Sequence, residues 1–295
     1  MQTRKLGPFT VSAIGLGAMP FSMGANEKPS REQAIATVHA ALDAGVTYID
    51  TADIYAPSAE EMGHNEEIIA AALKSYGGQL DDVVVGTKAG ITRGPGETWG
   101  RNASADYLRA AVEKALTILG TESIDLFQYH RPDRSLPYGE VISTFAALRD
   151  EGKIRAIGIS NANIEEIDVA IEVLGDGGLA SVQNEFSPTF RSSMDELKHC
   201  AEHGIAFLPW SPLGGTGKAS KDMGSTFPEF AEIGEAHGVS PQQVALAWEL
   251  SLSDTVIPIP GSSRPASITD SAKAADLQLS AEEIERLTAG GRGIR

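Results

Sequence analysis

Short apolar runs alternate with longer amphipathic segments along most of the chain. The runs are rich in β-branched residues, as buried parallel strands are, and they cover residues 13–17, 47–52, 83–87, 124–129, 154–159, 180–184, 205–210 and 256–259. The clearest helical pattern lies at 105–119, where one face carries Leu108, Val112, Ala115 and Leu119. Eight strands, each followed by a helix or a long loop, predict a (β/α)8 TIM barrel.

Turn and cap residues indicate where these elements begin and end. Residues 3–14 predict an N-terminal β-hairpin that turns at 7–8. The capping-box pattern predicts helix starts at Ser30, Ser240 and Ser280. Helices are expected to end, just before a strand, at Gly45, Gly152 and Gly204. Segments 94–96 and 214–226 are expected to be loops over one face. No linker divides the chain, so residues 1–295 are expected to form one domain.

Composition restricts the partners of the protein. The net charge is −16, from 24 basic and 40 acidic residues, and such a surface repels phosphate backbones and anionic lipids. We therefore expect no nucleic-acid or membrane partner. The lone cysteine, Cys200, excludes an internal disulfide. No apolar run reaches the ~20 residues that a bilayer requires, and the first residues lack the apolar core of a signal peptide. A soluble cytoplasmic protein is expected, and its oligomeric state stays open.

Polar side chains follow the predicted strands, at the end where such barrels carry their active sites. The second, third and fourth strands lead into Asp50, Lys88 and His130, and Tyr55 lies in the loop after Asp50. A tyrosine has an unperturbed pKa near 10, which a neighbouring ammonium lowers by stabilising the phenolate. We expect Lys88 to supply that ammonium and Asp50 to hold the lysine in place. Tyr55 would then be the general acid for a carbonyl whose oxygen accepts a hydrogen bond from His130.

At these residues the chain resembles the aldo-keto reductase superfamily, over about residues 4–287. The resemblance rests on motifs in family order: Gly-Leu-Gly-Ala-Met at 15–19, Asp-Thr-Ala-Asp-Ile-Tyr at 50–55, Gly-His-Asn-Glu-Glu at 63–67, Gly-Thr-Lys at 86–88, Ile-Asp-Leu-Phe-Gln-Tyr-His-Arg-Pro-Asp at 124–133, Gly-Lys-Ile-Arg-Ala-Ile-Gly-Ile-Ser-Asn at 152–161, Val-Gln-Asn-Glu-Phe-Ser at 182–187, Trp-Ser-Pro-Leu-Gly at 210–214 and Ile-Pro-Gly-Ser at 259–262. It implies NADPH-dependent reduction of an aldehyde or ketone, with the cofactor extended across the barrel mouth.

The resemblance also assigns residues to roles. It places the family's catalytic tetrad on Asp50, Tyr55, Lys88 and His130. It implies that Ser160, Asn161 and Gln183 hold the nicotinamide carboxamide and that Trp210 stacks on the nicotinamide ring. Ser211, Pro212, Leu213, Gly214 and Lys218 match the loop near the pyrophosphate. Ser262 and Arg264 match the positions that bind the adenosine 2′-phosphate in the family, and Asp270 and Ser271 match positions near adenine. The remaining expected cofactor contacts are Gly17, Ala18, Met19 and Gly261.

The sequence specifies the choice of cofactor and substrate less closely than it specifies the catalytic residues. Relatives often carry an arginine or glutamine near Ser267 and an asparagine at the position of Ser271, so NADPH is implied while NADH stays open. Trp99, in the loop after the third strand, is expected to wall the substrate pocket, with Met19 and Phe21 opposite. The physiological carbonyl compound and the direction of the reaction are not specified.

Other chemistry fits the pattern less well. The third glycine of a dinucleotide fingerprint after Gly15 would be position 20, which is Pro20. His130 has no His-x-His partner, so no metal site is expected. Two alternatives stay open: a nicotinamide-binding, redox-sensing barrel subunit with little turnover, and a barrel enzyme of another class, such as a lyase or hydrolase.

Overall fold

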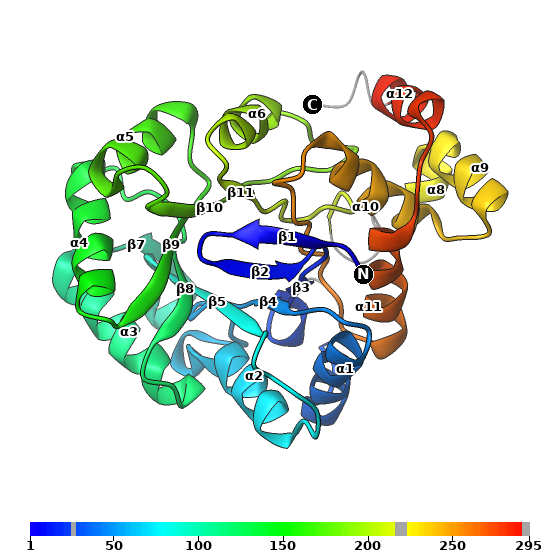
Figure 1. Ribbon diagram of the computed structural model, residues 1–295. Coiled ribbons are helices and arrows are strands. Elements are labelled where there is room, and N and C mark those ends of the chain that lie inside the picture. Colours follow the sequence, from blue (N-terminus) through cyan, green and yellow to red (C-terminus); the bar gives the residue numbers. More distant parts are fainter. Residues whose placement is uncertain (25–27, 216–222, 291–295) are drawn as a thin grey trace.

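Seven parallel strands form the wall of a barrel in the computed structural model, which describes residues 1–24, 28–215 and 223–290 (Figure 1). Hydrogen bonds join them in the order β11-β10-β9-β8-β5-β4-β3. Their bounds are β3 Leu16–Gly17, β4 Tyr48–Asp50, β5 Val84–Ala89, β8 Ile124–Tyr129, β9 Ile154–Ser160, β10 Leu179–Gln183 and β11 Ala206–Phe207. These strands lie within or close to the first seven predicted runs, and β3, β4 and β11 are shorter than predicted.

Residues 256–261 close the barrel between β11 and β3, where the eighth strand is predicted. Ile257 N donates to Phe207 O at 2.9 Å, and Gly17 N donates to Pro260 O at 3.1 Å. Pro258 and Pro260 have no N–H to donate toward β3, so the segment makes isolated bridges rather than a regular ladder. The (β/α)8 barrel is confirmed, with an irregular eighth wall segment.

Helices surround the barrel because the strands are largely buried on both faces. All six residues of β5 are buried, for example, and a parallel sheet of this kind requires cover on its outer side. Figure 1 shows the helices as an outer ring. Their bounds are α1 Arg31–Asp43, α2 His64–Ser75, α3 Ala105–Leu119, α4 Tyr138–Asp150, α5 Ile164–Leu174, α6 Met194–Glu202, α8 Met223–Thr226, α9 Pro228–His237, α10 Pro241–Leu252, α11 Pro265–Ala272 and α12 Ala281–Gly290. The helix predicted at 105–119 is confirmed as α3.

The predicted N-terminal hairpin, β1 (Thr3–Leu6) with β2 (Phe9–Ser12), lies across one end of the barrel (Figure 1). Its residues Leu6, Phe9 and Val11 belong to the same buried cluster as inward-facing strand residues such as Tyr48. A Cβ at Gly86 would lie 2.6 Å from the Tyr48 hydroxyl, so this glycine leaves room for the tyrosine ring inside the barrel. One end of the barrel is therefore filled, and the carboxyl ends of the strands are left for a site.

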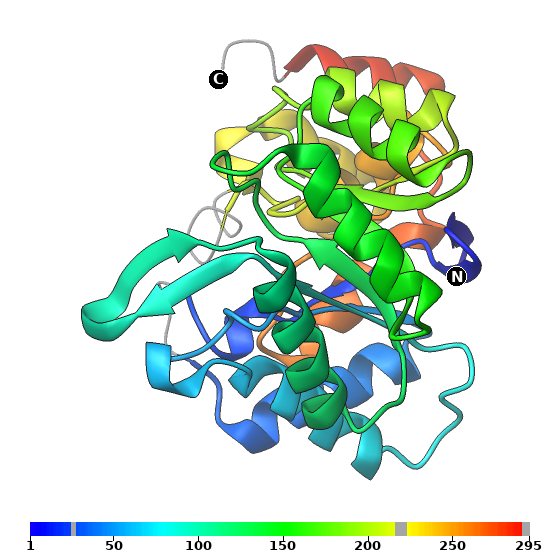
Figure 2. The same cartoon turned by 90° about the vertical axis from the view of Figure 1, so that its left-hand side faces the viewer.

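A second hairpin follows β5, in a region for which the sequence predicts only a loop. β6 (Ile91–Gly94) pairs with β7 (Thr98–Arg101) in an antiparallel register, around the short 3₁₀ turn η3 (Pro95–Glu97). Gly96 has a φ of 70° there, as a tight turn requires. Arg93 pairs with Glu97 and donates to Ala56 O at 2.7 Å. Figure 2 shows this hairpin projecting from the barrel.

The predicted helix boundaries hold, with one qualification. Ser280 and Glu283 make both hydrogen bonds of a capping box. Ser30 and Ser240 accept only the first bond, because the glutamine of each box donates to another partner. Gly45, Gly152 and Gly204 adopt positive φ values at helix ends, as predicted. No helix in the described part of the chain is long and apolar enough to cross a membrane.

Candidate active site

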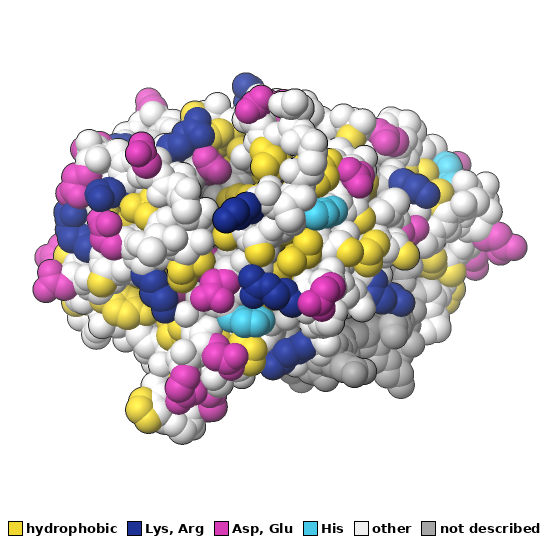
Figure 3. Space-filling model, turned by 90° about the horizontal axis from the view of Figure 1, so that it is seen from below, with side chains coloured by type: hydrophobic (Ala, Val, Ile, Leu, Met, Phe, Trp, Pro, Cys, Tyr) yellow, Lys and Arg dark blue, Asp and Glu magenta, His cyan; other side chains and the backbone are white. Residues whose placement is uncertain are grey.

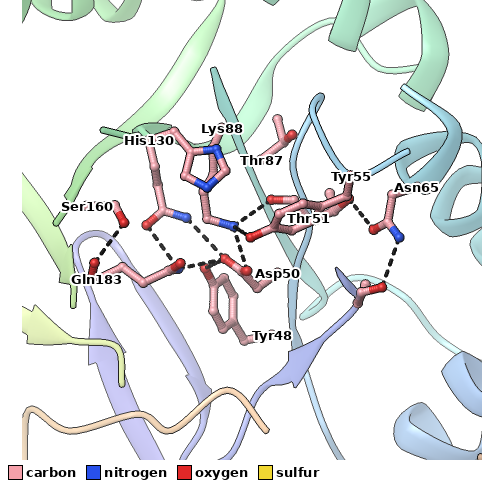
Figure 4. Close-up of polar contacts among 12 residues, drawn as sticks. Tyr48, Asp50, Thr51, Tyr55, Asn65, Thr87, Lys88, His130, Ser160 and Gln183 are labelled. Atoms are coloured by element: carbon pink, nitrogen blue, oxygen red, sulfur yellow. Dashed lines mark hydrogen bonds and ion pairs between the residues drawn. The ribbon is translucent and has the colours of Figure 1, made fainter. Parts of the chain in front are cut away.

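Asp50 and Lys88 form a buried ion pair at the carboxyl ends of β4 and β5. Lys88 Nζ lies 2.6 Å from Asp50 Oδ2 and also donates to Thr51 O at 2.8 Å. Lys88 is fully buried and Asp50 is 2% exposed. A buried ion pair needs further hydrogen bonds to offset its desolvation. Figure 4 shows that side chains from several strands supply them around Asp50.

Three uncharged side chains donate to Asp50 Oδ1. Gln183 Nε2 lies 2.8 Å away, and Gln128 Nε2 and the Tyr48 hydroxyl lie 3.2 Å away. The sequence predictions include Gln183 but not Gln128 or Tyr48. The signal for Gln128 is an uncharged polar residue inside a strand predicted to be buried, which suggests a partner within the barrel. These contacts fix the carboxylate and, through it, the lysine.

Tyr55 reaches the ion pair through Lys88. The Lys88 ammonium donates to the Tyr55 hydroxyl at 3.2 Å and lies 4.9 Å from the centre of its ring. The loop that carries Tyr55 is held by Asn65, whose Oδ1 accepts from Thr51 Oγ1 at 2.6 Å and whose backbone N donates to Tyr55 O. Asn65 Nδ2 donates to Ala18 O at 2.9 Å. The loop is thereby attached to the chain after β3 (Figure 4).

The electrostatics of Tyr55 differ from the prediction. Burial raises the pKa of Tyr55 above its ordinary value of 10, and the Lys88 charge opposes this rise without reversing it. Burial also works to lower the pKa of Lys88, but Asp50 and Tyr55 outweigh it and the pKa is raised. The expected fall in the Tyr55 pKa is therefore wrong for this structure, because desolvation of the phenolate exceeds the attraction of the ammonium. Tyr55 holds its proton at neutral pH, with a charged lysine beside it.

His130 lies against Tyr55 and is uncharged. The two rings meet edge to face, with centroids 5.7 Å apart. Burial, followed by the charges of Lys88, Arg131 and Arg101, lowers the pKa of His130 well below 6.5. A neutral imidazole has one N–H to donate. The structure brings together all four residues of the predicted tetrad at one point.

A large cavity opens over these residues, as expected for the carboxyl end of a barrel. Its volume is about 1080 Å³, slightly above the roughly 300–1,000 Å³ common for small-molecule sites. Many of the predicted site residues line it: Gly17, Met19, Asp50, Tyr55, Trp99, His130, Ser160, Asn161, Gln183, Trp210, Ser211, Pro212, Leu213, Gly261, Ser262 and Arg264. The cavity has room for a ligand that extends well beyond the tetrad.

Ser160 and Asn161 form a polar part of the cavity wall. Ser160 Oγ donates to Gln183 O at 2.7 Å, and Asn161 Nδ2 donates to His130 O at 3.0 Å. Asn161 has a φ of 58°, a left-handed conformation that turns the chain sharply after β9. Its Oδ1 accepts no hydrogen bond from a described residue. That oxygen can accept a hydrogen bond from an amide group of a ligand. The hydrogen bond from Asn161 to the His130 backbone holds the two residues in a fixed relative position.

Trp210 also lines the cavity and lies in the segment after β11. It packs against the interior cluster on one side and lines the cavity on the other, and its Nε1 has no hydrogen-bond partner among the described residues. The chain then turns at Ser211, which has a φ of 53°. Gly214 N donates to Ser211 O at 2.8 Å and closes this turn without lining the cavity. Lys218, predicted to contact the cofactor, lies outside the described residues.

The far end of the cavity is built where α1 and α11 pack together. Gln33 of α1 donates through Nε2 to Ser263 O at 2.7 Å. Arg264, the residue before α11, donates to Ser267 Oγ at 3.1 Å. Two predicted cofactor contacts, Asp270 and Ser271, do not line the cavity. Asp270 accepts hydrogen bonds from the helix start at 240–243 and is occupied there.

Two further predicted site residues, Phe21 and Ala18, do not line the cavity. Phe21 is 1% exposed and packs in a buried cluster with Leu16 and Val38, so it does not wall the substrate pocket. Ala18 is fully buried and also lies outside the lining. Trp99 does line the cavity, and the Arg93 guanidinium lies 4.9 Å from its ring centre. The short turn at 19–21 directs Phe21 into the protein core. From the sequence alone, an apolar residue at this position could equally have lined the pocket.

Cations gather in the cavity although the protein is acidic. Among the described lining residues, Lys28, Arg101, Arg131 and Arg264 are basic and only Asp50 is acidic. Acidic and basic side chains are instead intermixed over the outer face in Figure 3. The sequence predictions include Arg264 alone of these four cations. The cavity is therefore suited to a ligand with several negative charges.

Two buried acids, Glu66 of α2 and Asp53 of the Tyr55 loop, lie outside the cavity lining. Glu66 accepts from Thr87 Oγ1 at 2.5 Å, and burial raises its pKa to about 7. Burial and the charge of Glu66 raise the pKa of Asp53 well above its ordinary value. Within the described residues, no group of three or more His, Cys, Asp or Glu side chains is placed to hold a metal ion.

The comparisons with known proteins identify an oxidoreductase built on a (β/α)8 barrel. A model of the Aldo/keto reductase family matches residues 13–290, and the chain belongs to this family. It is 33% identical, over 98% of its length and 90% of the relative's, to an uncharacterized oxidoreductase of Schizosaccharomyces pombe. It is 32% identical to a 6-dehydroglucose reductase of Novosphingobium aromaticivorans, over 95% of this chain and 94% of that one. An aldo-keto reductase of Klebsiella pneumoniae solved with NADPH superimposes with a TM-score of 0.80 at 27% identity, covering 100% of this chain and 98% of that one.

Proposed function

We propose that this protein reduces an aldehyde or ketone to an alcohol, with Tyr55 as the general acid and NADPH as the preferred cofactor. The observation that carries the proposal is the Lys88 ammonium, which lies 2.6 Å from Asp50 and 3.2 Å from the Tyr55 hydroxyl at full burial. When bound, the reduced nicotinamide supplies a hydride to the carbonyl carbon. The protein must then supply a proton to the carbonyl oxygen.

The three polar groups around that oxygen have distinct tasks. Tyr55 donates the proton, since its raised pKa keeps it protonated at neutral pH. Lys88 stabilises the phenolate as the proton leaves, and the buried Asp50 keeps the ammonium in position. His130 is neutral, so it orients and polarises the oxygen by donating a hydrogen bond without competing as an acid.

The residues around the cavity suit NADPH in particular. Asn161 offers an acceptor for the carboxamide, Trp210 offers a ring face, and Arg264 offers a positive charge at the start of α11 for a phosphate. The Klebsiella pneumoniae relative binds NADPH in its crystal structure. NADH remains an alternative, to be compared by fluorescence titration of both cofactors.

The test is Tyr55→Phe, which removes the acidic proton and keeps the ring. We expect NADPH to bind with nearly unchanged affinity and kcat to fall by at least about 100-fold. Tyr76→Phe is the matched control, because Tyr76 is away from the cavity and donates to Asp43. Full activity in Tyr55→Phe would refute the proposal. Tight NADPH binding by the wild type with no turnover over a broad carbonyl panel would favour a redox-sensing role instead.

A further inference from the structure

Two arginines lie at the tetrad end of the cavity without an ion-pair partner among the described residues. Arg101 ends β7 of the projecting hairpin, and Arg131 directly follows His130. Both line the cavity together with Tyr55 and His130. Arg101 donates to the neighbouring Gly100 O at 2.9 Å, and neither arginine makes an ion pair with a described residue.

This state is unusual for arginines of this protein. Outside the cavity, arginines commonly pair with carboxylates, such as Arg109 with Glu151 at 2.7 Å and Arg155 with Asp125 at 2.8 Å. The chain carries 40 acidic residues against 24 basic ones, so acidic partners are abundant. An arginine left unpaired at a cavity wall therefore has its guanidinium donors available to a ligand.

Within the described residues, Asp133 and Glu185 interact electrostatically with these arginines, but neither forms an ion pair with them. Asp133 accepts from the Ser135 hydroxyl at 2.6 Å and from its backbone N at 3.1 Å. Glu185 is partly buried and makes no ion pair with Arg131. Burial, with the like charge of Arg101, lowers the pKa of Arg131, and the attraction of Glu185 opposes this fall without reversing it. A bound anion would offset both the desolvation and the mutual repulsion of the two guanidinium groups.

The position of the pair separates it from the phosphate-binding end of the cavity. Arg264 lies at the start of α11, where Ser263 is bonded to Gln33 of α1. Arg101 and Arg131 act instead on His130, whose protonation both oppose. They are thus within electrostatic reach of the group that orients the carbonyl.

We propose that Arg101 and Arg131 bind a carboxylate or similar anionic group of the substrate, so that the preferred carbonyl compounds carry a negative charge apart from the reacting carbonyl. The proposal rests on the proposed reductase function and adds a substrate class to it. Arginine suits this task because its planar fork of N–H donors matches a carboxylate. Trp99, two residues before Arg101 in β7, supplies an aromatic wall for the rest of the substrate.

The same donors could contact a phosphate of the cofactor, and the experiment separates these two anions. NADPH oxidation is followed with 4-carboxybenzaldehyde and with 4-methylbenzaldehyde, which differ in charge at one end and share the aldehyde. The variants are Arg101→Gln, Arg131→Gln and the double substitution. The matched control is Arg134→Gln, since Arg134 follows in the same loop, pairs with Glu166 and does not line the cavity. NADPH dissociation constants are measured by fluorescence for every variant.

We expect the wild type to favour the carboxylated aldehyde in kcat/KM. The double variant should lower the ratio of the two kcat/KM values by roughly 10- to 100-fold, mainly through KM, as for the loss of a charge-assisted hydrogen-bonded pair. Arg131→Lys should keep part of the ratio, and raising the salt concentration should reduce it in the wild type. Arg134→Gln should leave the ratio unchanged.

Two results would overturn the inference while leaving the reductase function intact. One is a wild type that reduces both aldehydes with equal kcat/KM. The other is a rise in the NADPH dissociation constant of the double variant that accounts for its whole loss of activity, since the arginines would then serve the cofactor. If the wild type binds NADPH and reduces no carbonyl compound at all, the proposed function fails and this inference fails with it.

Discussion

The buried network beneath the cavity, called the floor here, consists of Tyr48, Asp50, Lys88, Gln128 and Gln183, of which Asp50 and Gln183 line the cavity. It contrasts with the rim of the cavity, formed by Arg101, Arg131 and Arg264. On the floor the two charges are buried 2.6 Å apart, and three uncharged donors complete the coordination of the carboxylate. The rim cations stand on loops or element ends, partly exposed and without acidic partners among the described residues.

This difference between floor and rim indicates that the reaction step and the recognition of ligands are carried by separate parts of the site. A buried network with satisfied hydrogen bonds has one arrangement, so it holds a proton donor in constant geometry. Unpaired cations on loops leave donors free and can be exchanged without disturbing the barrel. The floor therefore suits the reaction step, and the rim suits recognition of what is to be reduced and of the cofactor. Substitutions in the two regions should therefore have effects that differ both in kind and in size.

The largest effect is expected from Lys88→Met on the floor. The substitution keeps most of the side-chain volume but leaves the Asp50 carboxylate buried without its countercharge, which costs about 3–5 kcal/mol of unfolding free energy. Activity should fall by at least about 100-fold, because nothing stabilises the Tyr55 phenolate. Urea unfolding and NADPH-consumption assays measure the two losses.

A double variant keeps this prediction open to test if Lys88→Met folds poorly. Lys88→Met with Asp50→Asn removes both charges together, so most of the lost stability should return while activity stays low. Should the double variant recover activity along with stability, Lys88 would be a structural residue rather than part of the proton-donating group.

A pH-dependent effect is expected from Glu66, the acid behind the floor. Its pKa is raised to about 7 from 4.5, so the unfolded chain ionises first as pH rises. Stability is therefore lost progressively between about pH 4.5 and pH 7, by about 3 kcal/mol in total. Glu66→Gln stays neutral and should be free of that loss, becoming more stable than the wild type at pH 8 but not below pH 4.5.

The measurement is urea unfolding of both proteins at pH 5 and pH 8. Glu67→Gln serves as the control, since Glu67 is the exposed neighbour on the same helix. If the wild type and Glu66→Gln differed by the same amount at both pH values, the carboxyl of Glu66 would not be titrating in this range.

The smallest effect is expected at the rim. Arg264→Gln should raise the NADPH dissociation constant by about 10-fold, as for the loss of one exposed charged contact to a phosphate, and should change NADH binding and protein stability little. Fluorescence titration with both cofactors is the readout. If the binding of NADPH and NADH weakened equally, Arg264 would not contact the adenosine 2′-phosphate that distinguishes NADPH from NADH.

The sequence alone predicted the parts of the molecule that depend on local pattern. The strand order, the helix at 105–119, the N-terminal hairpin and the placement of Asp50, Lys88 and His130 at strand ends are confirmed. They could be predicted because side-chain periodicity and cap residues act over a few neighbouring positions. The eighth strand was harder, because Pro258 and Pro260 interrupt its ladder.

The tertiary structure decided what depends on residues far apart in the chain. The burial of Phe21, the pairing of β6 with β7 and the convergence of Gln128 and Tyr48 on Asp50 all result from packing across the barrel. The direction of the Tyr55 pKa shift also belongs here. A sequence places an ammonium near a phenol, but only the packed barrel sets how much water is removed from both, and desolvation outweighed the charge.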